Sequence, residues 1–322
     1  MNPSRPGAQP TCCAPARPPI DAPAVTRSTT ARADPHVIQT PIPLAGGEFS
    51  MGDPFGEGYP TDGETPTHPV RLAPFAVDPT AVTNTEFAAF VAATGHTTDA
   101  ERYGSSAVFH LVVAAAEKDV LGQATGAPWW LAVRGADWNH PEGPRSDLTG
   151  RLDHPVVHVS YDDAQAYCRW AGKRLLTEAE WEYAARGGHH GRRFVWGDDL
   201  VPNGEHRCNI WQGHFPTTNT LEDGHLTTAP ARSFEPNDYG LWNLAGNVWE
   251  WCNDWFSPYY YKRSPAENPL GAPFGQARAM RGGSYLCHAS YCHRYRVAAR
   301  SSNTPNSSAG NLGFRCARDL TT

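Results

Sequence analysis

The strongest folding signals in this chain are three helix starts. In a capping box, a Ser or Thr caps the first turn and an acidic residue three positions later bonds back to the cap. Three pairs have this spacing: Thr83–Glu86, Ser160–Asp163 and Thr177–Glu180. Glycines at the far ends are C-cap candidates. We therefore predict three short helices, ending near Gly95, before Gly172 and at Gly187–Gly188.

Outside these helices the sequence is typical of turns and short strands. The 322 residues include 30 Gly, 29 Pro and 11 Trp, which indicates irregular connections pinned by large aromatic side chains. The segment VIQTPIPLAGGEFSMG (37–52) predicts a hairpin. No repeat of 20–50 residues and no linker after residue 36 is visible. We expect one α+β domain over 36–322 with little regular secondary structure.

The first 35 residues are expected to be disordered. They contain Arg, Pro and Ala but no continuous apolar stretch, so they match neither a signal peptide nor a packed segment. Cys12 and Cys13 lie there, and we predict no structural role for them. The cytoplasm is therefore the expected compartment, where thiols stay reduced. A net charge of −6 and the lack of a long apolar run argue against nucleic-acid and membrane partners.

The segment with the clearest chemistry is RGGSYLCHASYCHRYR, residues 281–296. Cys287 and Cys292 are surrounded by His288, His293 and Arg294, and cationic neighbours lower the pKa of a thiol. Two such thiolates could bind a soft ion such as Cu(I) or form a disulfide across a short loop. Two buried structural cysteines are the alternative, and spacing alone does not decide between them.

Two turn-rich segments offer hard oxygen donors. NLAGNVWEWCNDW (243–255) contains Asn243 and Glu250, and NIWQGHFPTTNTLEDGH (209–225) contains Asn209 and Asp223. Such oxygens suit Ca²⁺, although ordinary Asx turns explain the same residues. Trp249 and Trp251 are of the kind that usually fills a core.

Residues 281–316 resemble the carboxy-terminal motif of the formylglycine-generating enzyme, or sulfatase-modifying factor, family. Further similar segments are APWWLAVRGADWNHPEGP, HPVVHVSYDDAQAYCRWAGKRLLTEAEWEYAARGG and YGLWNLAGNVWEW, and the resemblance covers about 36–320. The last two are shared by a wider superfamily and indicate the fold, whereas the cysteine motif indicates the activity. The resemblance implies a variant of the C-type-lectin-like fold.

The resemblance also implies a reaction. Family members oxidise the cysteine of a C-x-P-x-R motif in unfolded or nascent sulfatases to C-alpha-formylglycine (3-oxoalanine), which activates the sulfatase. They use O₂, an external thiol reductant and Cu(I). The resemblance therefore implies an oxidoreductase acting on a protein cysteine, with a sulfatase chain as partner. We expect it to work as a monomer.

Site residues carry over from the family by position. The resemblance makes Cys287 and Cys292 the copper ligands, and Ser284, Trp249 and Tyr291 the pocket where O₂ meets the metal. Ser308 and Asn311 match the substrate groove. One calcium site would be formed by Asn209, Ile210, Asp223 and His225, and a second by Asn243, Gly246, Val248 and Glu250. Ile210, His225, Gly246 and Val248 would act through backbone carbonyls.

Two departures from the family concern disulfides and substrate recognition. Cys168 and Cys316 match one structural pair of secretory eukaryotic members, and the resemblance implies that they are neighbours. Ala185 and Val297 replace the other pair. The loop around Ser105 and Ser106 is polar where eukaryotic relatives have an acid, which leaves recognition of the substrate arginine open.

Two other functions compete with this one. A non-haem iron sulfoxide synthase has the same fold but needs an added helical domain, and the first 80 residues have few helix signals for it. A non-catalytic binding module of the lectin-like kind would lack the cysteine pair, which is present here.

Overall fold

The predicted helices are all present in the computed structural model, which describes residues 14–17, 33–34 and 37–320. Thr83, Ser160 and Thr177 each form a complete capping box, and a left-handed glycine follows each helix. A fourth helix was missed, although Thr98 and Glu101 form the same box. The helices are α1 (Asn84–Thr94), α2 (Asp99–Tyr103), α3 (Tyr161–Ala171) and α4 (Glu178–Arg186).

The strands are short and form several small sheets. One sheet has the order β1-β4-β15-β8, another β13-β12-β11-β14 and a third β5-β7-β6, while β2–β3 and β9–β10 form ribbons. The strands of the first half are β1 (Ile42–Leu44), β2 (Gly47–Met51), β3 (His68–Leu72), β4 (Phe75–Val77), β5 (Ser105–Phe109), β6 (Val120–Ala124), β7 (Ala127–Arg134) and β8 (Arg174–Leu175). Those of the second half are β9 (Gly213–His214), β10 (Thr218–Asn219), β11 (Trp249–Trp255), β12 (Arg278–Arg281), β13 (Arg300–Asn303), β14 (Leu312–Phe314) and β15 (Cys316–Asp319).

The predicted hairpin within 37–52 is wrong in its pairing. Both of its arms are strands, but β1 pairs with β4 and β2 pairs with β3, all in one antiparallel register. The Gly46 turn is packed against the opposite arm, since a Cβ there would lie 2.4 Å from the Leu72 carbonyl oxygen. The segment is therefore one arm of a longer ribbon, because its apolar residues find partners in the later strands.

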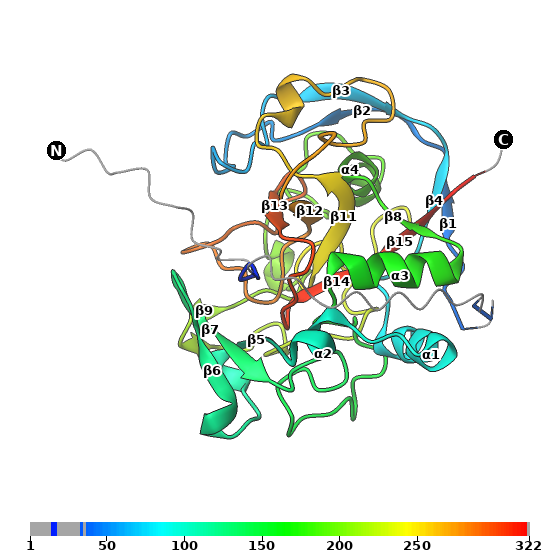
Figure 1. The fold of residues 1–322 in the computed structure, drawn as a ribbon. Coiled ribbons are helices and arrows are strands. Elements are labelled where there is room, and N and C mark those ends of the chain that lie inside the picture. The colour runs from blue at the N-terminus through cyan, green and yellow to red at the C-terminus, as the bar shows by residue number, and fades with distance from the viewer. Residues whose placement is uncertain (1–13, 18–32, 35–36, 321–322) are drawn as a thin grey trace.

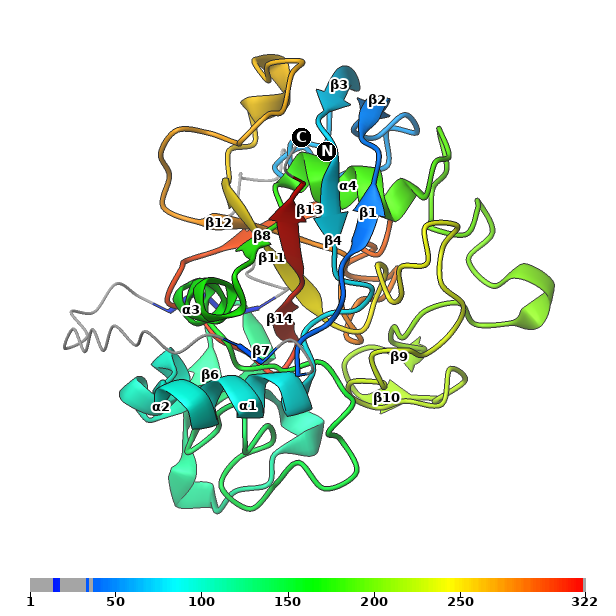
Figure 2. The same cartoon turned by 90° about the vertical axis from the view of Figure 1, so that its right-hand side faces the viewer.

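The layers place the central sheet between the helices. The β2–β3 ribbon arches over α4 at one end of the molecule, and β5–β7 with α1 and α2 occupy the other end (Figures 1 and 2). Large aromatic side chains fill the interior: Trp130, Trp181, Trp211, Trp249 and Trp251 are all fully buried. The predicted α+β architecture pinned by aromatic residues is confirmed.

Buried arginines tie the cysteine-containing segment to α4. Arg281 donates to Glu182 at 2.6 Å and to Glu178 at 3.3 Å. Arg300 donates to both carboxylate oxygens of Glu178, at 2.9 and 2.7 Å. Arg186 also donates a hydrogen bond to Glu182, at 2.6 Å. Burial alone would raise the pKa values of Glu178 and Glu182. The positive charges of the neighbouring arginines outweigh this effect, so both pKa values are lowered.

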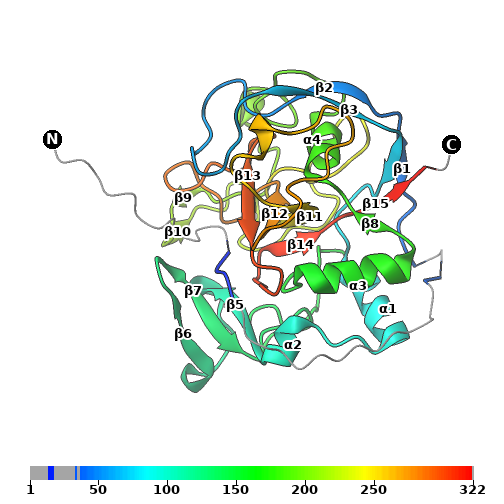
Figure 3. The ribbon, with the colours of Figure 1, turned by 45° about the horizontal axis from the view of Figure 1, so that its top comes forward.

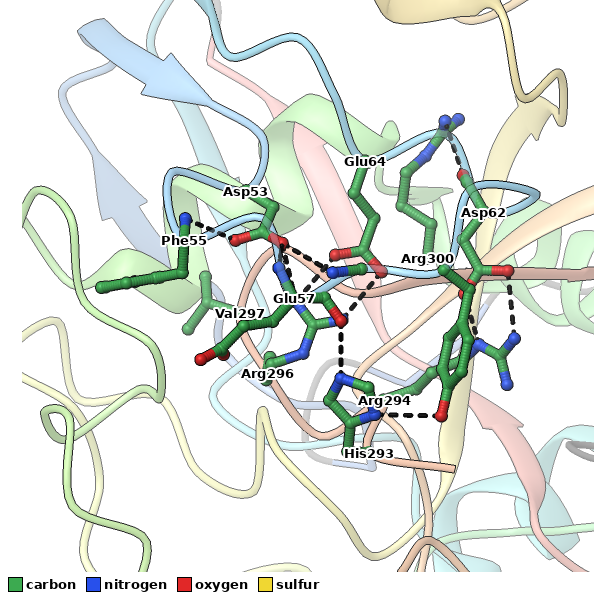
Figure 4. Close-up of polar contacts among 12 residues, drawn as sticks. Asp53, Phe55, Glu57, Asp62, Glu64, His293, Arg294, Arg296, Val297 and Arg300 are labelled. Atoms are coloured by element: carbon green, nitrogen blue, oxygen red, sulfur yellow. Dashed lines mark hydrogen bonds and ion pairs between the residues drawn. The ribbon is translucent and has the colours of Figure 1, made fainter. Parts of the chain in front are cut away.

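The loop 53–64 closes over the same segment from the other side. Arg294 pairs with Asp62, and Arg296 pairs with Glu64 at 2.8 and 2.9 Å (Figure 4). His293 also reaches this loop, contacting the Glu57 carbonyl oxygen at 2.7 Å and the Tyr59 hydroxyl at 3.0 Å. The segment 281–300 is thus held by ion pairs on two sides.

Most of the predicted disordered tail lies outside the described residues, including Cys12 and Cys13. Residues 14–17 are described, and there the prediction of disorder is wrong, because they pack between β5 and β13 (Figure 3). Among the described residues, no helix is long and apolar enough to cross a membrane.

We expect Arg296→Met to lower the free energy of unfolding by about 3–5 kcal/mol, because it leaves buried Glu64 and Asp53 without their cation. Arg71→Met is the matched control. Arg71 pairs with Glu48 at the surface, where the two side chains are 60% and 62% exposed, so its loss should cost no more than about 1 kcal/mol. Urea denaturation of both variants measures the difference, and equal losses would contradict it.

Candidate active site

The structure brings Cys287 and Cys292 together. Their sulfur atoms are 3.5 Å apart, and both residues are buried free thiols. The loop between them is tight, with the Cys292 amide donating to the His288 carbonyl at 2.7 Å. The structure thus brings together the two cysteines that the family resemblance pairs, and both belong to the main hydrophobic cluster. Two buried sulfurs that face each other form a soft donor pair.

Of the three predicted cationic neighbours, Arg294 contacts a thiol. Its Nη1 donates to Cys292 Sγ at 3.5 Å, and the Ser284 amide donates to Cys287 Sγ at 3.4 Å. The expected contribution of the histidines is not seen, because His293 bonds to the loop 53–64 and His288 bonds to Ser290 Oγ at 2.8 Å. Each sulfur therefore accepts a hydrogen bond from a neighbouring donor.

Ser284, Asn311 and Trp249 are also brought together. Asn311 Nδ2 donates to Ser284 Oγ at 2.9 Å, and the Trp249 amide donates to the Asn311 carbonyl at 2.9 Å. These contacts follow from the parallel pairing of β11 with β14, in which Trp249 lies opposite Leu312. Ser284 is thereby fixed next to the Cys287 thiol.

Tyr291 belongs to an aromatic cluster that the sequence analysis missed. Its ring stacks on Phe215, with centroids 4.2 Å apart and an interplanar angle of 3°, and meets the edge of Trp129 at 5.2 Å. Trp211 contacts the same Phe215 and donates its amide to the Cys287 carbonyl at 3.1 Å. The richness of residues 209–217 in aromatic side chains was the available signal.

Ser308 is the end of a buried hydrogen-bond chain. His158 Nε2 lies 2.7 Å from the Pro141 carbonyl, which only accepts, so we assign the proton to Nε2. His158 Nδ1 then accepts from Ser106 Oγ at 2.8 Å, and Ser106 accepts from Ser308 Oγ at 2.7 Å. The lone pairs of Ser308 therefore remain available to a donor in the groove.

Comparison with known proteins decides the family. The model of the sulfatase-modifying factor enzyme 1-like domain matches residues 27–320. The formylglycine-generating enzyme of Streptomyces coelicolor is 69% identical over 297 residues, covering 92% of this chain and 95% of the relative. That of Thermomonospora curvata is 56% identical over 291 residues, covering 89% and 96%. The chain belongs to the formylglycine-generating enzyme family.

The fold agrees with this assignment. The structure of PvdO from Pseudomonas aeruginosa superposes with a TM-score of 0.65 at 25% identity, covering 92% of this chain and all of that one. The expected variant of the C-type-lectin-like fold, as a single α+β domain, is thus confirmed.

The first family calcium set contains a buried oxygen atom without a hydrogen-bond partner in the described part of the chain. The Asn209 Oδ1 atom is buried and has no hydrogen-bond partner within the described structure. The Ile210 carbonyl and Asp223 Oδ2 both contact the side-chain amide of Gln212. His225 donates its amide to Asp223 Oδ1 at 2.9 Å. An unpartnered amide oxygen, a carboxylate and a backbone carbonyl are the kinds of donor that Ca²⁺ takes.

The second set lies next to the first, because Asn209 and Gly246 form a parallel bridge. Asn243 Oδ1 is likewise buried without a partner within the described structure. Val248 directly precedes β11, and Glu250 accepts from Arg315 Nη2 and Trp181 Nε1, each at 2.8 Å. Glu250 is therefore primarily the buried counter-ion of Arg315. Among the described residues, no group of three or more His, Cys, Asp or Glu side chains could hold a metal, so backbone and amide oxygens would have to contribute.

Cys168 and Cys316 are neighbours, as the family pattern implied. Their sulfurs are 3.5 Å apart, and both are buried free thiols. Burial, reinforced by Cys168, raises the pKa of Cys316 well above its usual value, which makes it a poor nucleophile. Ala185 and Val297, at the other family pair, are packed in one hydrophobic cluster.

The buried His158 predicts a pH dependence of stability. Burial lowers its pKa from 6.5 to about 4, so between these values the unfolded chain binds more protons than the folded protein. The neutral His158 side chain therefore contributes fully to the free energy of unfolding above about pH 6.5. This contribution, about 3 kcal/mol, is lost as the pH falls toward 4.

His158→Gln removes this titration. Wild type should lose about 3 kcal/mol more unfolding free energy than the variant between pH 6.5 and pH 4, measured by urea denaturation at each pH. Parallel pH profiles for the two proteins would contradict the neutral, buried His158.

Proposed function

We propose that this chain oxidises the cysteine of a C-x-P-x-R motif in unfolded or nascent sulfatases to C-alpha-formylglycine, which activates the sulfatase. The observation that carries the proposal is the pair of buried thiols 3.5 Å apart, within the segment that resembles the family's carboxy-terminal motif. Membership of a family whose close relatives are named formylglycine-generating enzymes supports it. O₂ and an external thiol reductant are the proposed co-reactants, and the cytoplasm is the proposed compartment.

The thiol pair fits Cu(I), because soft sulfur donors select this ion. Cys287 and Cys292 would hold it, and when bound it would supply the one-electron chemistry with O₂ that side chains lack.

The chain's own residues hold and orient the thiols. The Ser284 amide and Arg294 donate to the two sulfurs and so fix their positions. Asn311 fixes Ser284, and its neighbour Ser308 offers lone pairs to a substrate donor. The stacked Tyr291 and Phe215 add an apolar wall that limits water. Positioning and water exclusion are the protein's contribution.

We expect Cys287→Ser and Cys292→Ser each to abolish Cu(I) binding at sub-micromolar concentration and aldehyde formation, since a hydroxyl is a hard and weak donor. The assay combines protein, Cu(I), dithiothreitol, air and a C-x-P-x-R peptide, with the aldehyde detected by mass. Cys168→Ala is the control, because its thiol pairs with Cys316 and contacts neither sulfur of the active pair. Full turnover in either serine variant would show that the ligands are wrong.

Calcium is proposed as a structural ion at the two oxygen sets. Because it would bind only the folded state, it should raise the Tm, and chelation should lower it. Asn209→Ala and Asn243→Ala should each reduce the Tm difference between calcium and EDTA, measured by scanning calorimetry. Glu250→Ala is a poor test, because it also removes the carboxylate that pairs with the buried Arg315. Identical Tm values with calcium and with EDTA would contradict the calcium sites and show that these residues form only ordinary Asx turns.

A further inference from the structure

Residues 14–17 pack against a surface that is called the groove below and is formed by Tyr103, Ser105, Asn303, Thr304, Ser307 and Ser308. The Arg17 amide donates to Ser307 Oγ at 2.8 Å, and Thr304 Oγ1 donates to the Arg17 carbonyl at 3.0 Å. Asn303 Nδ2 donates to the carbonyls of Ala14 and Pro15 at 3.2 and 3.4 Å. Figure 3 shows this dark blue segment between β5 and β13. The groove therefore binds the backbone of an extended peptide through side chains.

The groove also binds an arginine side chain. Arg17 Nη2 donates to the Ser105 carbonyl at 2.7 Å and to Ser308 Oγ at 3.4 Å. The guanidinium lies over the Tyr103 ring, 4.2 Å from its centroid. Burial lowers the pKa of Arg17, while the charges of Asp99 and Asp163 favour its protonated form. This contact set answers how a chain with serines at 105 and 106 can recognise an arginine.

The sequence around Arg17 has the spacing of the proposed substrate. Residues 13–17 read Cys-Ala-Pro-Ala-Arg, which is a C-x-P-x-R motif, and this motif occurs once in the chain. Cys12 has no proline two positions later, so the motif singles out Cys13. Ala14 is buried in the same hydrophobic cluster as Cys287 and Cys292. The chain thus contains both a C-x-P-x-R motif and the groove in which the last four residues of that motif lie.

We propose that the C-x-P-x-R motif at 13–17 is a substrate segment carried in cis. Residues 14–17 occupy the groove and compete with sulfatase chains, and Cys13, which precedes them in sequence, is the residue offered for oxidation. This inference rests on the proposed function. In the balanced reaction, the Cys13 –CH₂–SH group, O₂ and two reductant thiols give an aldehyde, H₂S, one reductant disulfide and water. Cys13 supplies two electrons and two protons, the two reductant thiols supply two more of each, and together these reduce O₂ to two waters. One water is then consumed when the thioaldehyde left at Cys13 hydrolyses to the aldehyde and H₂S.

Competition is tested by binding, without copper or reductant. The probe is a dye-labelled S-x-P-x-R peptide, whose serine prevents turnover, and the readout is fluorescence anisotropy. Arg17→Ala should bind it roughly tenfold more tightly than wild type, because the internal competitor has lost its anchor. Arg27→Ala, outside the motif, is the matched control and should bind like wild type.

The outcomes separate the two proposals. Equal affinity for all three proteins would overturn the cis occupant alone. Binding to none of them would show that the groove does not read C-x-P-x-R, and the proposed function would fall with it.

Oxidation of Cys13 is tested by tandem mass spectrometry of the full chain after incubation with Cu(I), dithiothreitol and air. The aldehyde should appear at Cys13 and not at Cys12, at a rate that does not change on dilution, and it should be lost in Arg17→Ala. A Cys13 that stays a thiol while a separate C-x-P-x-R peptide is converted would overturn presentation in cis and leave the proposed function intact.

Discussion

The buried arginines of residues 281–300 are the constraint on which the site depends. A charge removed from water must be paired and hydrogen-bonded, or the fold does not form. Arg281 and Arg300 satisfy this on α4, whereas Arg294 and Arg296 satisfy it on the loop 53–64. Because the two cysteines lie between these anchors in sequence, the ion pairs on both sides fix where the thiols can be.

This arrangement explains how a region with little regular secondary structure can hold a precise geometry. The segment from Gly282 to Ala299 has no strand or helix, so backbone ladders do not position the thiols. Side chains replace them: Arg294 bridges the Asp62 pair and the Cys292 sulfur, and Asn311 links β14 to Ser284. Arg294 therefore couples the loop 53–64 directly to the chemistry.

Local signals were predictable from the sequence, and partners far along the chain were not. Capping boxes gave three helices, because both halves of each box lie within four residues. The arms of the segment 37–52 were recognised as extended, but their partners lie 17 to 35 residues further along the chain (Met51 with His68, Ile42 with Val77), so the predicted pairing was wrong. His293 was placed at the thiols from its position in sequence, whereas its ring bonds to the Glu57 carbonyl.

The role of Cys287 and Cys292 and the contact between Cys168 and Cys316 came from the family resemblance, and the latter pair is 148 positions apart, which spacing could not reveal. The prediction of disorder was wrong at residues 14–17 for a different reason. Composition gives an average expectation over 35 residues, while four residues with a matching groove are enough to order a short stretch.

The tail also illustrates why a short motif can bind in cis. Ordering each residue costs roughly 1–2 kcal/mol, so a five-residue motif with few side-chain anchors binds weakly as a separate peptide. Here the segment is tethered, since the Ala33 amide bonds to the Trp170 carbonyl at 3.2 Å and residues 18–32 join it to Arg17. A tether of this length gives an effective concentration of order millimolar. A sulfatase chain at lower concentration must therefore gain additional contacts outside the motif to displace it.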